Sequence, residues 1–182
     1  MTRHATKNGS GFMWLAGLAC VGTLGLAACD KKADAGKAEP SAAGEPAAAA
    51  SVDVTKRPPV VQGYEKLRDA LAHDDLAAAK AAGAELATAV TTAKLDERIA
   101  TMGTGLGKAP DLASARLVFG EISRAYLTAM KDKPDLAGGQ VFVFRCPMAE
   151  GYQKWVQLDE TMKNPYMGKK MLDCGSKSDL IP

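Results

Sequence analysis

Sulfur-bearing side chains gather near turn-forming residues in the last quarter of this 182-residue chain. Met148 lies two residues after Cys146, and Met171 lies three residues before Cys174. Thiolate and thioether are soft ligands that select Cu(I), and by similar softness Ag(I), over Mg, Ca or Mn. Cys146 and Met148 can point the same way in a looping backbone, and Met171 and Cys174 share a face if their segment is helical. The spacing therefore predicts that these four residues bind a soft metal, Cu(I) above all.

Met167 is a further candidate, because it lies four residues before Met171 and could add a local thioether. Histidine is nearly absent: His4 is close to the N-terminus, and His73 is the other one. We interpret His73 as an exposed polar residue between two helices. This composition argues against His-rich catalytic zinc sites and Cys2His2 zinc sites, so any metal binding is expected to depend on sulfur.

The same two cysteines allow a second interpretation that needs no metal. An exported chain meets an oxidising compartment, where an even pair of cysteines is typical of a disulfide. A bond between Cys146 and Cys174 would close a loop of about 28 residues, worth roughly 3.6 kcal/mol in the chain-entropy model. The cysteine count alone favours the disulfide, and the flanking methionines favour the metal.

The N-terminal residues indicate export. Arg3 and Lys7 precede an apolar stretch over 12–28 that is shorter than the ~20 residues of a spanning helix. This stretch ends in Leu26-Ala27-Ala28-Cys29, which resembles the lipobox of bacterial lipoprotein precursors. The resemblance implies a signal peptide over 1–28 and a lipid on Cys29. An ordinary secretion signal cut nearby is the alternative.

The lipid would anchor the protein to the periplasmic face of a cell membrane. Asp30, directly after the lipidated cysteine, slightly favours the inner membrane by the rule for enteric bacteria. Residues 29–59 are rich in Ala, Pro and Lys and predict a disordered tether. Without Arg3 and Lys7, the basic residues equal the 21 acidic ones. A neutral chain with few aromatic residues does not favour nucleic-acid binding.

Residues 60–182 predict one domain that is mainly α-helical. Apolar residues at helical spacing indicate a first helix through Tyr64, a second begun by Asp74 or Asp75, a third over 94–102 and a fourth with Pro110 in its first turn. The third helix is expected to end at the Gly103, Gly105 and Gly107 cluster. The residues expected to form the buried faces are, for the first helix, Val61, Tyr64, Leu67 and Leu71; for the second, Leu76, Ala79, Gly83, Leu86 and Val90; and for the fourth, Leu112, Ala115, Phe119, Ile122, Tyr126 and Met130.

After these helices the apolar residues no longer recur at helical spacing. Residues 141–144 and 155–158 predict two strands, joined by a loop over 147–154. Trp155 is expected to anchor the hairpin. The predicted fold is a small antiparallel bundle of three or four helices, followed by a short β-hairpin and an irregular segment bearing Cys and Met.

Catalysis has little support in the sequence. It contains no nucleophile elbow, HExxH motif or CxxC motif, and its glycine run at 103–107 lacks the Lys-Ser/Thr of a phosphate loop. We therefore expect a protein that is not an enzyme.

The C-terminal motif resembles domain of unknown function 3347, an exported domain similar to a C-terminal region of some copper/silver efflux adaptors. The residues that carry the likeness are Cys146-Pro147-Met148-Ala149, Trp155, Asn164-Pro165-Tyr166, Gly168, Met171-Leu172 and Cys174-Gly175, with Tyr64, Leu67 and 70–79 upstream. The resemblance implies copper handling through Cys146, Met148, Met171 and Cys174, with heavy-metal efflux components as partners. Met167 stands where the family more often has tyrosine.

Overall fold

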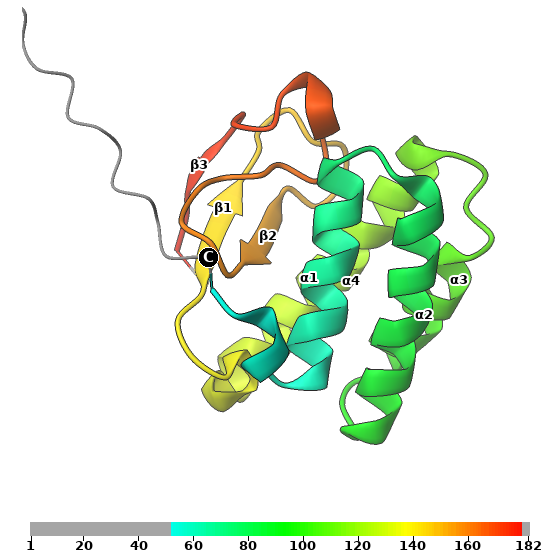
Figure 1. Ribbon diagram of the computed structural model, residues 1–182, viewed down its shortest axis with the longest axis vertical. Coiled ribbons are helices and arrows are strands. Elements are labelled where there is room, and N and C mark those ends of the chain that lie inside the picture. The colour runs from blue at the N-terminus through cyan, green and yellow to red at the C-terminus, as the bar shows by residue number, and fades with distance from the viewer. Residues whose placement is uncertain (1–51, 180–182) are drawn as a thin grey trace, which may run out of the picture. The chain divides into compact units, whose positions relative to one another are not determined.

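The computed structural model describes residues 52–179. These residues form four α-helices, α1 (Pro59–Ala72), α2 (Leu76–Thr92), α3 (Glu97–Leu106) and α4 (Leu112–Asp132), followed by a small antiparallel sheet (Figure 1). Short 3-10 turns are η1 (Val54–Lys56), η2 (Pro134–Ala137) and η3 (Gly168–Lys170). The predicted fold of a helical bundle followed by a hairpin is confirmed.

Aspartate side chains begin three of the helices. Asp75, Asp96 and Asp111 accept hydrogen bonds from the backbone N–H of Ala78, Arg98 and Ser114. These caps satisfy donors that lack a partner within the helix. The expected start of the fourth helix is slightly wrong, since Asp111 caps it and Pro110 lies before the cap.

The third helix begins three residues later and ends four residues later than the predicted range of 94–102. It begins at Glu97, passes through Gly103 and Gly105, and ends at Leu106. The glycines do not stop it because α2 lies against it: a Cβ on Gly103 would come 2.6 Å from the Gly83 carbonyl oxygen, and one on Gly83 2.8 Å from that of Gly103. A pair of glycines thus permits close contact between the two helix backbones.

The sheet has the order β2–β1–β3, and both neighbouring pairs are antiparallel. Its strands are β1 (Phe142–Arg145), β2 (Lys154–Gln157) and β3 (Ser176–Lys177). The hairpin is confirmed with a shift of one residue in each strand. The third strand was not predicted, because its two residues are too few to show a period.

Aromatic side chains join the bundle and the sheet into one core. Tyr64 of α1 lies 5.5 Å from Phe119 of α4 between ring centroids, and Phe119 lies 5.6 Å from Tyr166. Tyr166 meets Trp155 of β2 edge-on at 5.8 Å. Trp155 is fully buried, as expected. The sheet is therefore held against α4 by ring packing.

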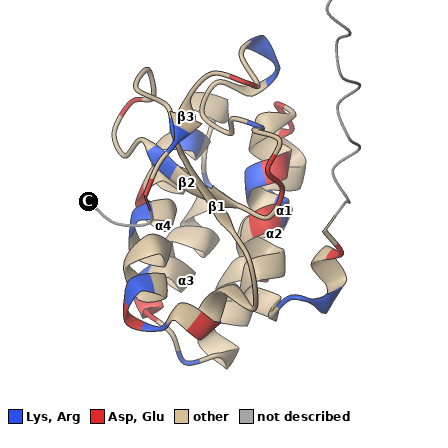
Figure 2. Ribbon diagram, turned by 90° about the vertical axis from the view of Figure 1, so that its left-hand side faces the viewer, with Lys and Arg blue, Asp and Glu red and all other residues tan. Residues whose placement is uncertain are grey.

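Charged residues are interspersed over the helices and loops (Figure 2). Surface pairs such as Lys66–Glu85 and Arg124–Glu121 join opposite charges. Within residues 52–179, no helix combines the length and apolar character needed to cross a bilayer.

The final residues of the predicted tether lie against the bundle. Arg57 donates hydrogen bonds to the carbonyl oxygens of Ala137 and Gln140, at 3.3 and 3.0 Å. Gln62 of α1 donates to the carbonyl oxygens of Thr55 and Arg57. The predicted signal peptide and residues 29–51 lie outside the described residues.

Candidate soft-metal site

The pairing of β1 with β3 brings the two cysteines together. Arg145 is the register partner of Ser176, so Cys146, which follows β1, lies beside the residues that lead into β3. The two Sγ atoms are 3.9 Å apart, and both cysteines are free thiols. Cys146 is fully buried and Cys174 is partly exposed. One thiol is therefore held in the core and the other is open to an incoming ligand.

Met148 adds a third sulfur to this pair. The N–H of Ala149 donates to the Cys146 carbonyl oxygen at 3.2 Å, which closes a tight turn and places Met148 at its surface. The Cys174 thiol donates to the Met148 Sδ at 3.8 Å. Met148 is 59% exposed, so this third sulfur-bearing residue is accessible from solvent. We call Cys146, Cys174 and Met148 the sulfur cluster.

Gln153 holds the turn that carries Met148. Its side-chain amide donates to the carbonyl oxygens of Pro147 and Ala149, at 3.0 and 3.2 Å. Its amide oxygen accepts from the Arg145 guanidinium at 2.8 Å. The N–H of Cys146 also donates to the Gln153 carbonyl oxygen. Because these bonds already hold the turn in one conformation, less conformational entropy would be lost if the turn bound a metal.

Asn164 holds the opposite cysteine. Its side chain is fully buried, and its amide donates to the Cys174 carbonyl oxygen at 2.6 Å. Its amide oxygen accepts from the N–H groups of Tyr166 and Met167. Its own backbone N–H donates to the Leu172 carbonyl oxygen at 2.7 Å. Asn164, which the sequence showed only as part of the motif with Pro165 and Tyr166, therefore organises the C-terminal segment.

Gly175 allows the cysteine segment to approach β1. Its φ of +140° is a conformation that glycine adopts readily, and a Cβ there would come 2.7 Å from the Arg145 carbonyl oxygen. The same Cβ would lie 3.2 Å from the Met162 Sδ. Met162 thus lies beside the Cys174–Gly175 segment. Nothing in its local spacing distinguished it.

Met171 takes a different place from the one predicted. The 3-10 turn η3 ends at Lys170, and Met171 has a φ of −152°, so Met171 and Cys174 do not share a helical face. Met171 instead accepts the Cys174 N–H at its carbonyl oxygen. Met167 is partly buried and lines a hollow with Met148. In the described part of the chain, the thiol contacts to other sulfurs are those within the sulfur cluster.

The Cys174 thiol is not an activated nucleophile. Desolvation raises its pKa, and the hydrogen bond and charge of Cys146 and the charge of Asp173 raise it further. A thiol of raised pKa stays protonated at neutral pH, whereas catalytic cysteines have a lowered pKa. A metal that binds at the sulfur cluster would have to displace this proton.

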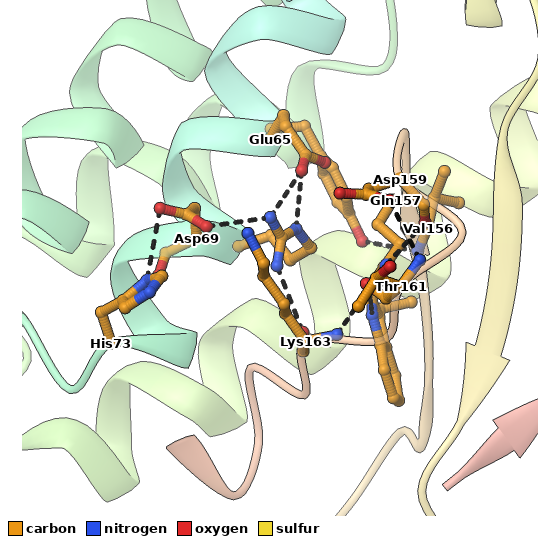
Figure 3. A network of polar contacts seen from close by, with 11 residues as sticks. Glu65, Asp69, His73, Val156, Gln157, Asp159, Thr161 and Lys163 are labelled. Atoms are coloured by element: carbon orange, nitrogen blue, oxygen red, sulfur yellow. Dashed lines mark hydrogen bonds and ion pairs between the residues drawn. The ribbon is translucent and has the colours of Figure 1, made fainter. Parts of the chain in front are cut away.

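A buried polar network lies under the loop that leads from β2 to Asn164 (Figure 3). Arg68 of α1 is 3% exposed; it donates to the Glu65 carboxylate and, at 3.2 Å, to the Lys163 carbonyl oxygen. Gln157 accepts the N–H of Lys163 and donates to the Thr161 carbonyl oxygen. The loop is thus tied to both α1 and β2. His73, at the edge of this network, is exposed and bonds to Asp69, as expected of a surface residue.

A second set of bonds ties η3 to the bundle. Arg116 of α4 donates to the Asp74 carboxylate at 2.5 Å and to the Pro165 carbonyl oxygen at 2.9 Å. Asp74 also accepts the N–H of Lys169 at 3.1 Å. Burial alone would raise the pKa of Asp74, but the bonds from Arg116 and Lys169 and their charges outweigh it and lower the pKa. We call Asp74 and Arg116 the latch.

The donor set of the sulfur cluster fits a soft metal. Metal–sulfur bonds of about 2.3 Å at trigonal or tetrahedral angles separate the sulfurs by about 3.8 to 4.0 Å. The two measured separations are 3.9 and 3.8 Å. Among residues 52–179, no three His, Cys, Asp or Glu side chains gather in a way that could hold a metal ion. Cys29, the predicted lipid attachment residue, lies outside the described residues.

Residues 60–134 match a family model described as a protein of unknown function, DUF3347. The resemblance to this domain is confirmed over these residues. The match spans α1 to α4 and ends before Cys146, so the motif on which the resemblance mainly rested lies beyond it. No curated protein matches the chain. No solved structure matches it either.

Proposed function

We propose that the chain carries a soft-metal site that binds Cu(I). The site lies beside the helices of residues 60–134, which match the DUF3347 family model. Cys146 and Cys174 supply thiolates, and Met148 supplies a thioether. The single observation that carries this proposal is the meeting of the three sulfurs at separations of 3.9 and 3.8 Å. Met171 serves in this proposal as a backbone support for Cys174, and Met167 is not part of the three-sulfur set.

The environment of the sulfur cluster supports a retained metal. Cys146 is fully buried, which limits access of competing water, while the exposed Met148 leaves a route for exchange. The turn of Cys146 is held by Gln153, and Cys174 is held by Asn164, so both thiols are positioned before the metal arrives. Such support of ligands by neighbouring hydrogen bonds raises metal affinity.

The cellular role follows from the N-terminal signal. We place the protein on the periplasmic face of a membrane, anchored by lipid on Cys29 and joined to the domain by the tether. In that position a Cu(I) protein takes part in copper homeostasis or efflux, and its partners are components of a heavy-metal efflux system. It carries metal and is not an enzyme.

A competition titration tests the metal site. The reduced full chain is titrated with Cu(I) against bathocuproine disulfonate, in a Cys20→Ser, Cys29→Ser background that removes the two N-terminal thiols. Added Cys146→Ser and Cys174→Ser changes are expected to lower affinity by about tenfold or more, the loss seen even for supporting residues. Met102→Leu on α3 is the matched control and should leave affinity unchanged. Equal affinity with and without Cys146 and Cys174 contradicts the proposal.

The second candidate is a protein-interaction module without metal, stapled by a Cys146–Cys174 disulfide. The thiol separation of 3.9 Å favours it as well, because a small movement would join the sulfurs. It predicts a mass two hydrogens lighter, full protection from alkylating reagents in air, and a melting temperature that Cu(I) does not change. Thiol counting and metal analysis on protein purified from its own envelope separate the two candidates.

A further inference from the structure

A hollow of about 250 Å³ adjoins the sulfur cluster. Its walls come from the start of α4, from the turn after β1 and from the segment before η3. Two methionines line it, Met148 from the turn and Met167 from the segment. Ala113, Leu117, Ala149 and Tyr166 supply further apolar surface. The sulfur-containing residues among those that line this hollow are therefore both methionines.

Met148 belongs to both the hollow and the sulfur cluster. Its Sδ lies 3.8 Å from the Cys174 Sγ, and its side chain lines the hollow. It is 59% exposed and has three rotatable bonds, so it can turn between the two positions. Leu117 on the rim is 47% exposed, which leaves the hollow accessible from solvent.

Charged groups at the hollow do not prevent cation binding. Arg116 contributes to the wall, but its guanidinium is bonded to the Asp74 carboxylate and to the carbonyl oxygens of Leu71 and Pro165. Glu150 lines the hollow as well and is exposed. Its carboxylate adds an attraction for a positive ion.

We propose that Met148 and Met167 form a second site for a soft monovalent cation, Ag(I) or Cu(I), that needs no thiol. Thioethers carry no proton to displace and do not form disulfides, so this site survives oxidation of the cysteines. The inference rests on the proposed function for one step, the passage of the cation to Cys174. In that step a metal–Cys174 sulfur bond forms, the metal–Met167 bond breaks, and the thiol proton passes to solvent. No oxidation state changes.

The test uses Ag(I), which is soft and not readily oxidised or reduced. The full chain with Cys20, Cys29, Cys146 and Cys174 all changed to Ser is labelled with ¹³C at the methionine methyl groups and titrated with Ag(I). The methyl signals of Met148 and Met167 are expected to shift together, while that of Met102 stays in place. Met167→Leu should weaken Ag(I) binding by about tenfold or more and remove the Met148 shift. Leu keeps the side-chain volume, and the helical circular dichroism confirms folding.

The outcomes separate this inference from the proposed function. If the Met167 signal does not move in the four-Ser protein, or if Met102 moves equally, the thioether site is disproved. The proposed function is judged on the protein that keeps Cys146 and Cys174, which should bind Ag(I) more tightly than the four-Ser protein. If it does not, the thiol site fails even where the thioether signals shift.

Discussion

The side-chain amide of Asn164 donates a 2.6 Å hydrogen bond to the carbonyl oxygen of Cys174. Asn164 is fully buried, and its amide oxygen accepts the N–H groups of the next turn. One side chain therefore determines both where the exposed cysteine lies and how the chain turns toward η3. The sulfur cluster depends on this residue although it carries no sulfur.

We predict that Asn164→Asp displaces Cys174. The carboxylate can still accept the N–H of Tyr166 and Met167, but it places an acceptor against the Cys174 carbonyl oxygen. Loss of this buried bond should lower the free energy of unfolding by about 2 to 3 kcal/mol and weaken Cu(I) binding. Chemical denaturation and the chelator competition measure the two effects. Asn8→Asp is a control outside the described domain. Unchanged Cu(I) affinity would show that Asn164 does not position the site.

The latch between Asp74 and Arg116 should make stability depend on pH. The pKa of Asp74 is lowered in the fold, so its contribution is present above the ordinary carboxyl pKa of about 3.9 and is lost as the pH falls through the lowered value. Asp74→Asn should therefore reduce stability by about 1 kcal/mol or more at pH 7, with the difference shrinking below about pH 4. Asparagine tolerates the φ of +56° at this position, so the backbone is retained.

Denaturation curves at several pH values measure this effect. Asp75→Asn is the matched control, because asparagine is an equally good helix cap. A constant difference between Asp74→Asn and the unchanged protein from pH 7 to pH 3 would contradict the role of the latch.

Replacing glycines of α2 and α3 with alanine should lower the stability at some positions and raise it at another. Gly83→Ala and Gly103→Ala each place a Cβ within 2.8 Å of a backbone oxygen on the other helix, so both should destabilise by about 1 to 3 kcal/mol. Gly105 lies in the same helix as Gly103 but has no such atom within 4 Å. Gly105→Ala should therefore stabilise by about 0.5 to 1 kcal/mol. Thermal unfolding measures the stability of all three variants. If all three changes shift the stability in the same direction, the close contact between the helices is contradicted.

Tyr64 and Tyr126 are stacked on each other, and removing the hydroxyl group from each allows a direct comparison. The Tyr64 hydroxyl bonds to the Ser123 hydroxyl at 2.7 Å and accepts the N–H of Val156 at 3.3 Å. The Tyr126 hydroxyl is buried and has no hydrogen-bond partner among residues 52–179. Tyr64→Phe should destabilise by about 1 to 3 kcal/mol, because it leaves two buried groups without a partner.

Tyr126→Phe should be neutral or stabilising, since it removes a buried polar group that makes no bond. Urea denaturation of both variants compares them directly. If Tyr126→Phe destabilises as much as Tyr64→Phe, the difference in hydrogen bonding does not control stability there.

The presence of the helices and the face that each one buries were predictable, because both depend on residues three and four positions apart. Tyr64, Leu67 and Leu71 are all buried, as their spacing indicated. Asp75 caps α2 by a bond to a residue three positions away, which is also a local relation. The end of α3 was not predictable, because Gly103 is tolerated only through its contact with Gly83 on another helix.

The sequence by itself determined the helical frame and the choice of sulfur over histidine as the candidate metal donor. The tertiary structure decided which sulfurs meet. Cys146, Cys174 and Met148 come together through the pairing of β1 with the two-residue strand β3, and Met171 does not share a helical face with Cys174 because η3 ends at Lys170. A strand so short has no hydrophobic period, and its partner lies about thirty residues away in the chain. Contacts of that kind follow from packing and hydrogen bonding across the whole domain, which local spacing does not encode.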